Sequence, residues 1–78
     1  MHVFVGKVGE TLFDGDAYSL TAPGSAGELT VLGGHMPLVT TLKAGTVRLH
    51  VTKDSEAQEF AALDGVLEVT GDGARVLL

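Results

Sequence analysis

The eleven glycines of this 78-residue chain limit its possible folds more than any other feature of the sequence. They are scattered without a fixed period. Together with two prolines they interrupt every window of about eleven residues that would otherwise show apolar positions at helical spacing. Because Gly and Pro weaken a helix interior, we expect no helix. Glycines at short, irregular intervals instead predict frequent tight turns, and frequent turns in a short chain predict short strands.

Alternation of apolar and polar residues marks the strands. It is clearest where Val47, Leu49 and Val51 alternate with polar residues, which predicts a strand with one face turned to a core. Weaker runs predict further strands over residues 2–8, 17–22, 28–32, 37–42, 58–63, 66–70 and 74–78. Gly, Asp and Ser predict reversals at residues 71–73, 53–56, 64–65 and 14–15. Eight or more short strands indicate an all-β fold, a flattened antiparallel β-sandwich or barrel.

Length and composition narrow the class of protein. A chain of this size has room for one core, so residues 1–78 are expected to form a single domain. A hydrophobic content of 45% argues against disorder, and the absence of cysteine removes disulfides and thiolate metal sites. A net charge of -5 would repel a phosphate backbone, so nucleic acid is not an expected partner. With no apolar segment suited to a membrane span or a signal peptide, we expect a soluble cytoplasmic protein.

Two stretches, residues 23–27 and 33–37, are not explained by strand alternation, and function could lie there. Residues 24–27 and 6–9 each match the GxxG pattern of loops that clamp a nucleic-acid backbone. That module needs flanking helices and a basic surround, which the sequence does not provide. Both are therefore interpreted as turns.

The three histidines and the acidic residues give no pattern typical of catalysis. His2, His35 and His50 lack metal-ligand spacing, and His35 is interpreted first as a residue satisfied locally by backbone carbonyls. Most acidic residues lie in turns or alternate outward, where water solvates them. We therefore expect no catalytic, cofactor-binding or metal-binding residues, and we interpret the chain as a binding or scaffold module.

Three motifs carry a resemblance to a known family. They are PG-xx-GE-xx-VL at residues 23–32, GH-x-PL at 34–38 and LK-x-G-x-VR at 42–48, and they are supported by segments 12–16 and 65–69. In this order and spacing they closely resemble the amino-terminal domain of the F-type ATP synthase epsilon subunit. The resemblance covers essentially the whole chain.

The resemblance implies a ten-stranded β-sandwich at the foot of the rotating central stalk. Such a domain binds the gamma subunit and the membrane-embedded c-ring, and it helps to couple proton or sodium flow to ATP synthesis without chemistry of its own. It would lie peripherally on the cytoplasmic face of a bacterial inner membrane. A stiff, dry core suits that role, because a packed interior resists shear.

The resemblance also assigns roles to individual positions. Glu28 matches an acidic residue that faces the polar loops of the c-ring, whereas His35 and Thr40 match positions on the gamma side. An exposed ion pair would give orientation and only ~0.2–1 kcal/mol, so the stable contact is expected to be apolar. We look for that contact at Met36, Pro37 and Leu38.

The sequence departs from the family pattern in three respects, one of which is Asp64-Gly65 in place of the more frequent Gly pair. Gly33 and Ala44 stand where the family more usually has Pro, so both turns lose a fixed φ. The chain also ends at Leu78, without the carboxy-terminal helical hairpin that in many members binds ATP or inhibits hydrolysis. We therefore expect a form that cannot inhibit in that way, either naturally short or cut.

The sequence leaves two other classes of protein open. A biotinyl or lipoyl carrier domain has a similar size, but the neighbours of Lys43 and Lys53 fit its modified hairpin poorly. A small ligand-binding barrel would have a deep pocket lined by converging polar groups.

Overall fold

The computed structural model describes all 78 residues and consists of strands joined by turns. The nine strands are β1 (His2–Lys7), β2 (Glu10–Asp16), β3 (Ser19–Gly24), β4 (Gly27–Leu32), β5 (Leu38–Leu42), β6 (Gly45–His50), β7 (Gln58–Ala62), β8 (Gly65–Thr70) and β9 (Gly73–Leu77). No helix that could cross a membrane is present. The all-β prediction is confirmed, with nine strands where the resemblance implies ten.

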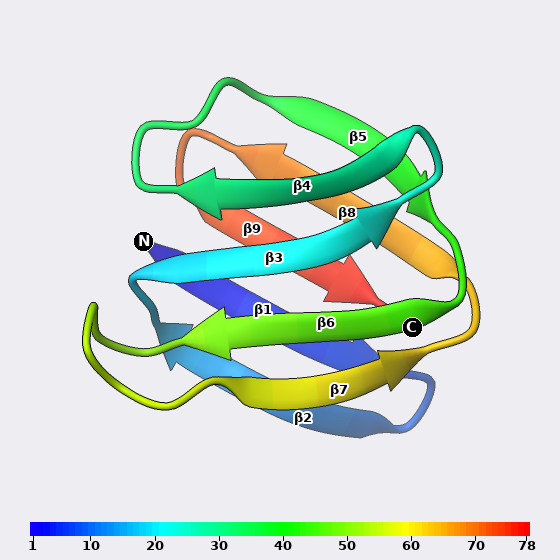
Figure 1. The fold of residues 1–78 in the computed structure, drawn as a ribbon, viewed down its shortest axis with the longest axis horizontal. Helices are drawn as coiled ribbons and strands as arrows, with labels where there is room; N and C mark the ends of the chain where they lie inside the picture. The colour runs from blue at the N-terminus through cyan, green and yellow to red at the C-terminus, as the bar shows by residue number, and fades with distance from the viewer.

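The strands form two layers. Strands β2, β1, β9, β8 and β5 lie side by side in one layer, and β4, β3, β6 and β7 lie in the other, as Figure 1 shows. All neighbouring strands are antiparallel except β1 and β9, which pair in parallel. Parallel neighbours need a long connection, and here nearly the whole chain lies between the two. The sandwich prediction is therefore confirmed, and its antiparallel character holds at every pair but this one.

The two layers are joined at a corner between β5 and β6. β5 pairs with β8 along its length and meets β3 only where Leu42 lies opposite Gly24. The backbone N–H of Lys43 then donates to the Pro23 carbonyl at 2.9 Å. Gly45 follows so closely that a Cβ there would lie 3.0 Å from Pro23 Cβ. The chain thus changes layer by bending at residues 43–44, as strands do at the corners of packed sheets.

Inward-facing residues from both layers fill a single core. Val47 and Leu49 of β6 are fully buried, as their alternation predicts. Val51 is not: β6 ends at His50, and Val51 is 39% exposed in the following turn. The buried hydrophobic residues are Val3, Val5, Ala17, Leu20, Ala22, Val31, Leu42, Val47, Leu49, Ala62, Leu67, Val69, Ala74 and Val76.

Strand β2 is absent from the strands that the sequence predicts, and the predicted turn at residues 14–15 is wrong. Both residues lie inside β2 and pair with β1. The cause is a β-bulge: Val5 lies opposite Phe13, but the next residue, Gly6, lies opposite Thr11. The extra residue in β2 breaks the period of two, so alternation does not reveal the strand.

The predicted hairpin at residues 71–73 is confirmed between β8 and β9. Only Gly73 uses a positive φ there, at +150°, and a Cβ at this position would overlap the backbone carbonyl oxygen of His2. Gly71 has no positive φ and open space around it. Gly73 therefore allows β1 to lie directly against β9, whereas Gly71 only completes the turn.

Replacing Val47 with Asp should abolish folding. The side chain is fully buried and the structure offers it no cationic partner, so the carboxylate should destabilise the fold by more than about 4 kcal/mol. Val8→Asp is the matched control, because Val8 is fully exposed and its substitution should change stability by less than about 0.5 kcal/mol. Circular dichroism and urea unfolding would measure both. A folded, cooperative Val47→Asp variant would contradict this account of the core.

Gly73→Ala should destabilise the fold far more than Gly71→Ala. We expect a loss of about 2 kcal/mol or more at Gly73, because its φ is unfavourable for alanine and the added methyl displaces the His2 backbone. Gly71→Ala should change stability by less than about 1 kcal/mol in either direction. Thermal unfolding of both variants checks the difference. Equal effects would mean that the β1–β9 contact does not depend on Gly73.

Candidate functional site

A groove of about 440 Å³ opens between β4 and β5. It exists because each of these strands lacks a neighbour on one side: β4 pairs only with β3, and the edge of β5 away from β8 meets β3 only at Leu42. The lining residues are Gly24, Ala26, Gly27, Glu28, Leu29, Leu38, Val39 and Thr40. The groove is therefore bordered by residues of the first and second sequence motifs and by Val39 and Thr40, which follow the second.

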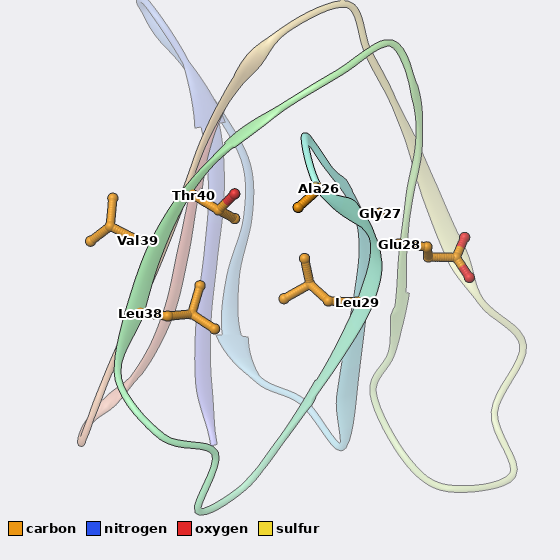
Figure 2. A pocket seen from close by; sticks show the side chains of 8 residues that line it. Ala26, Gly27, Glu28, Leu29, Leu38, Val39 and Thr40 are labelled. Atoms are coloured by element: carbon orange, nitrogen blue, oxygen red, sulfur yellow. The ribbon is translucent and has the colours of Figure 1, made fainter.

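The side chains inside the groove are small or apolar. Figure 2 shows Leu38 and Thr40 projecting from β5 toward β4, and Ala26 and Leu29 projecting toward β5. Leu29 and Leu38 also pack against the core, so the groove floor continues into the hydrophobic interior. The Thr40 hydroxyl donates to the neighbouring Thr41 carbonyl at 3.1 Å. Such a surface is suited to receiving apolar side chains of a partner.

The β5 edge beside the groove carries no charge. Its sequence is LVTTL, and Val39 is 69% exposed on the side of β5 away from the groove interior (Figure 2). Proteins commonly protect exposed strand edges with charged residues or prolines. An uncharged, partly apolar edge on a short strand is typical of a surface that another protein covers.

The loop before β5 presents the other predicted apolar residues. Met36 is 78% exposed and Pro37 is also exposed, whereas Leu38 is half-buried in the groove. His35 is held locally: its backbone N–H donates to the Leu32 carbonyl at 3.1 Å, and its Nδ1 lies 2.7 Å from the Met36 carbonyl oxygen. The interpretation of His35 as locally satisfied is confirmed.

His35 and Thr40 lie on the same open side of the sandwich but not in one cavity. Thr40 lines the groove between β4 and β5. His35 borders a separate hollow of about 190 Å³, which is formed with the end of β4 and the turn between β8 and β9. The two predicted gamma-facing residues therefore border two different hollows.

Glu28 points away from the groove, on the outer face of the sheet that contains β4 (Figure 2). Its side chain is 61% exposed, and its Oε2 lies 3.3 Å from Arg48 Nη2. Sequence reasoning missed Arg48 as a functional candidate. The available signal was that Glu28 belongs to the first motif and Arg48 ends the third, so one ion pair joins motifs whose residues are 20 positions apart.

A two-residue hairpin turn positions Glu28. Ser25 and Ala26 form the turn between β3 and β4, and Gly27 follows with a φ of +134°. The Ser25 N–H also donates to the Thr41 carbonyl at 2.9 Å, which ties the hairpin to β5. The acidic side chain is therefore presented from the start of β4, next to a turn that is fixed to both layers, which suits an orienting contact.

These features define a β-sandwich domain with one shared core, an apolar groove between β4 and β5 and a paired carboxylate on the outer face. Across residues 1–78 the chain matches the family model for the β-sandwich domain of the ATP synthase delta/epsilon chain. The chain belongs to this family, and the resemblance to the epsilon subunit is confirmed. The carrier-domain alternative is not favoured.

Curated relatives agree with this assignment. The ATP synthase epsilon chain of Herminiimonas arsenicoxydans is 38% identical over 77 residues, covering 99% of this chain and 55% of the relative. That of Bordetella parapertussis is 39% identical over 77 residues, covering 99% of this chain and 54% of the relative. The chain thus spans about half the length of the curated relatives that it matches.

Solved structures share the fold at low sequence identity. A chain of the Euglena gracilis mitochondrial ATP synthase, in a structure that includes F1 and the c-ring, superposes with a TM-score of 0.85 at 18% identity, covering 96% of this chain and 48% of its own. A chain of the Tetrahymena thermophila mitochondrial ATP synthase central stalk and c-ring gives a TM-score of 0.78 at 17% identity, covering 99% of this chain and 61% of its own. The two-layer sandwich is therefore the family fold.

Proposed function

We propose that this domain is a non-catalytic rotor part of a proton- or sodium-translocating F-type ATP synthase. In this role it lies at the foot of the central stalk between the gamma subunit and the c-ring, peripheral to the cytoplasmic face of a bacterial inner membrane. The observation that carries the proposal is the family match over the whole chain. The direction of the Glu28 side chain, outward and away from the groove (Figure 2), supports it, because a part held between two partners needs two contact surfaces.

The proposed mechanism is mechanical coupling. Ion passage turns the ring, and this domain turns with the ring and gamma while ATP is made at catalytic sites elsewhere. Such a part must resist shear, and its resistance comes from a packed core shared by the two layers and from the corner where the chain crosses between them. The domain contributes stiffness and alignment to this process.

The gamma contact is proposed on the side formed by β5 and the loop before it. Met36 and Pro37 would supply exposed apolar surface, and the groove beside Leu38 and Thr40 would receive partner side chains. His35 would lie at the far end of the same contact. Burial of apolar area contributes roughly 25 cal/mol per Å², so this side would supply most of the affinity.

The c-ring contact is proposed at Glu28. Its exposed carboxylate would meet basic side chains on the polar loops of the ring. An ion pair of this kind contributes ~0.2–1 kcal/mol, so its effect is on orientation and on the rate of association more than on total affinity.

Glu28→Lys should weaken association with a purified gamma–c-ring complex by about tenfold, because it removes the ion pair and adds a repulsion. The free energy of unfolding should change by less than about 1 kcal/mol, since Glu28 is exposed. Glu10→Lys is the matched control: Glu10 also forms an exposed ion pair, with Lys7 at 3.5 Å, but in the β1–β2 hairpin. Equal losses of affinity for both variants, or a fall in stability that parallels the loss of affinity, would contradict the interface role.

Met36→Glu should weaken binding to isolated gamma by about tenfold without changing the melting temperature, because Met36 is 78% exposed. Leu38→Glu should reduce both binding and stability, since Leu38 packs partly against the core. Val8→Glu, at a fully exposed position outside this side, serves as the control and should change neither quantity. Unchanged gamma affinity in the Met36 variant would place the apolar contact elsewhere. Surface plasmon resonance and thermal unfolding give the two readouts.

A further inference from the structure

Arg48 stands between two carboxylates on the outer face of the β4–β3–β6–β7 sheet. Glu28 lies on β4, diagonally across β3 from Arg48, and Glu59 lies directly opposite Arg48 on β7. The neighbours of Arg48 along β6, Val47 and Leu49, are fully buried, so Arg48 itself faces outward. One guanidinium therefore has two carboxylates within its range.

In the structure Arg48 is paired with only one of them. Its Nη2 lies 3.3 Å from Glu28 Oε2, and no ion pair joins it to Glu59. Directly opposite residues on antiparallel strands have Cβ atoms about 4.5–5.5 Å apart, which an arginine side chain can span without moving the backbone. Glu59 is thus a second partner that the side chain can reach by rotation alone.

The polar side chains around Arg48 do not block its pairing with either Glu28 or Glu59. Thr21, opposite Arg48 on β3, has its hydroxyl 3.0 Å from that of Thr30 on β4. His50, two residues along β6, has its Nδ1 2.9 Å from the Ser55 carbonyl oxygen. Neither side chain competes for the guanidinium.

We infer that Arg48 is a two-position arginine that makes Glu28 selective for a cationic partner side chain. In the free domain Arg48 forms an ion pair with Glu28. When a lysine or arginine of the partner binds Glu28, Arg48 turns to Glu59 and remains paired. A neutral or anionic partner surface does not replace Arg48, and Glu28 then stays paired with Arg48. The inference rests on the proposed function in one respect, namely that Glu28 meets basic side chains of the ring.

Glu59 takes part in this exchange without touching the partner. If Glu59 is removed, a released Arg48 has no second carboxylate and stays beside the incoming cation, where like charges repel. If Arg48 is removed as well, loss of Glu59 no longer affects the affinity for the partner. The exchange therefore predicts a coupling between Arg48 and Glu59 that an ordinary surface ion pair with Glu28 would not produce.

The first experiment uses the isolated 78-residue chain and side-chain NMR. In Glu28→Gln, NOEs from the Arg48 guanidinium to the Glu59 side chain should appear, replacing those to residue 28 in the unsubstituted chain. The control, Glu10→Gln, should leave the Arg48–Glu28 contact in place. Absence of any Arg48–Glu59 contact in Glu28→Gln overturns the inference, whatever the partner is.

The second experiment measures binding to a detergent-solubilised complex of gamma and the c-ring. Glu59→Gln should weaken binding by about twofold to fivefold, and the effect should vanish in an Arg48→Gln background. Glu56→Gln, in the connection between β6 and β7, is the charge-matched control and should bind normally. If Glu28→Gln weakens binding but Glu59→Gln does not, the exchange is wrong and the proposed function stands. If Glu28→Gln binds normally, the ring contact at Glu28 is wrong, and the NMR result alone decides whether Arg48 changes partner.

Discussion

The corner at which the chain passes from one sheet to the other organises the molecule. Two backbone hydrogen bonds close it, from Lys43 N–H to the Pro23 carbonyl and from Ser25 N–H to the Thr41 carbonyl. These bonds hold the β3–β4 hairpin against the end of β5, and Gly45 permits the close approach to Pro23. Residues of the first motif, Pro23 and Gly24, and of the third motif, Leu42 and Lys43, lie at this corner. Their spacing along the chain is thus explained first by the geometry of a sheet-to-sheet crossing.

This geometry separates residues with a structural role from the proposed interface residues Glu28 and Met36. The glycines and Pro23 are accounted for by turns and close contacts, so they need no further role. Glu28 and Met36 have no comparable structural reason, because both side chains are exposed and neither supports the core. β5 contacts β3 only at this corner, and the rest of its free edge borders the groove between β5 and β4. The crossing between the sheets and the exposed groove are therefore two consequences of one backbone arrangement.

The sequence predicts those parts of the fold that obey a period of two. Val47 and Leu49 identify β6 because each alternate side chain enters the core, but the same pattern cannot show that the strand ends at His50. The bulge in β2 conceals a whole strand, and the parallel pairing of β1 with β9 joins the chain ends without any local signal. Arg48 was missed for a similar reason: an ion pair across β3 depends on register, which local patterns do not contain.

The distribution of charge suits a part that turns together with its partners. In the proposed role gamma, the ring and this domain rotate as one body, so their contacts carry load without being broken at each turn. Apolar burial beside β5 would then supply lasting affinity, because salt does not screen it as it screens an ion pair. The exposed Glu28 carboxylate supplies angular alignment, since an ion pair is sensitive to where a partner's charge lies. An arginine that can move to Glu59 keeps the outer face of the sheet paired before and after docking, so assembly need not leave a charge without a partner.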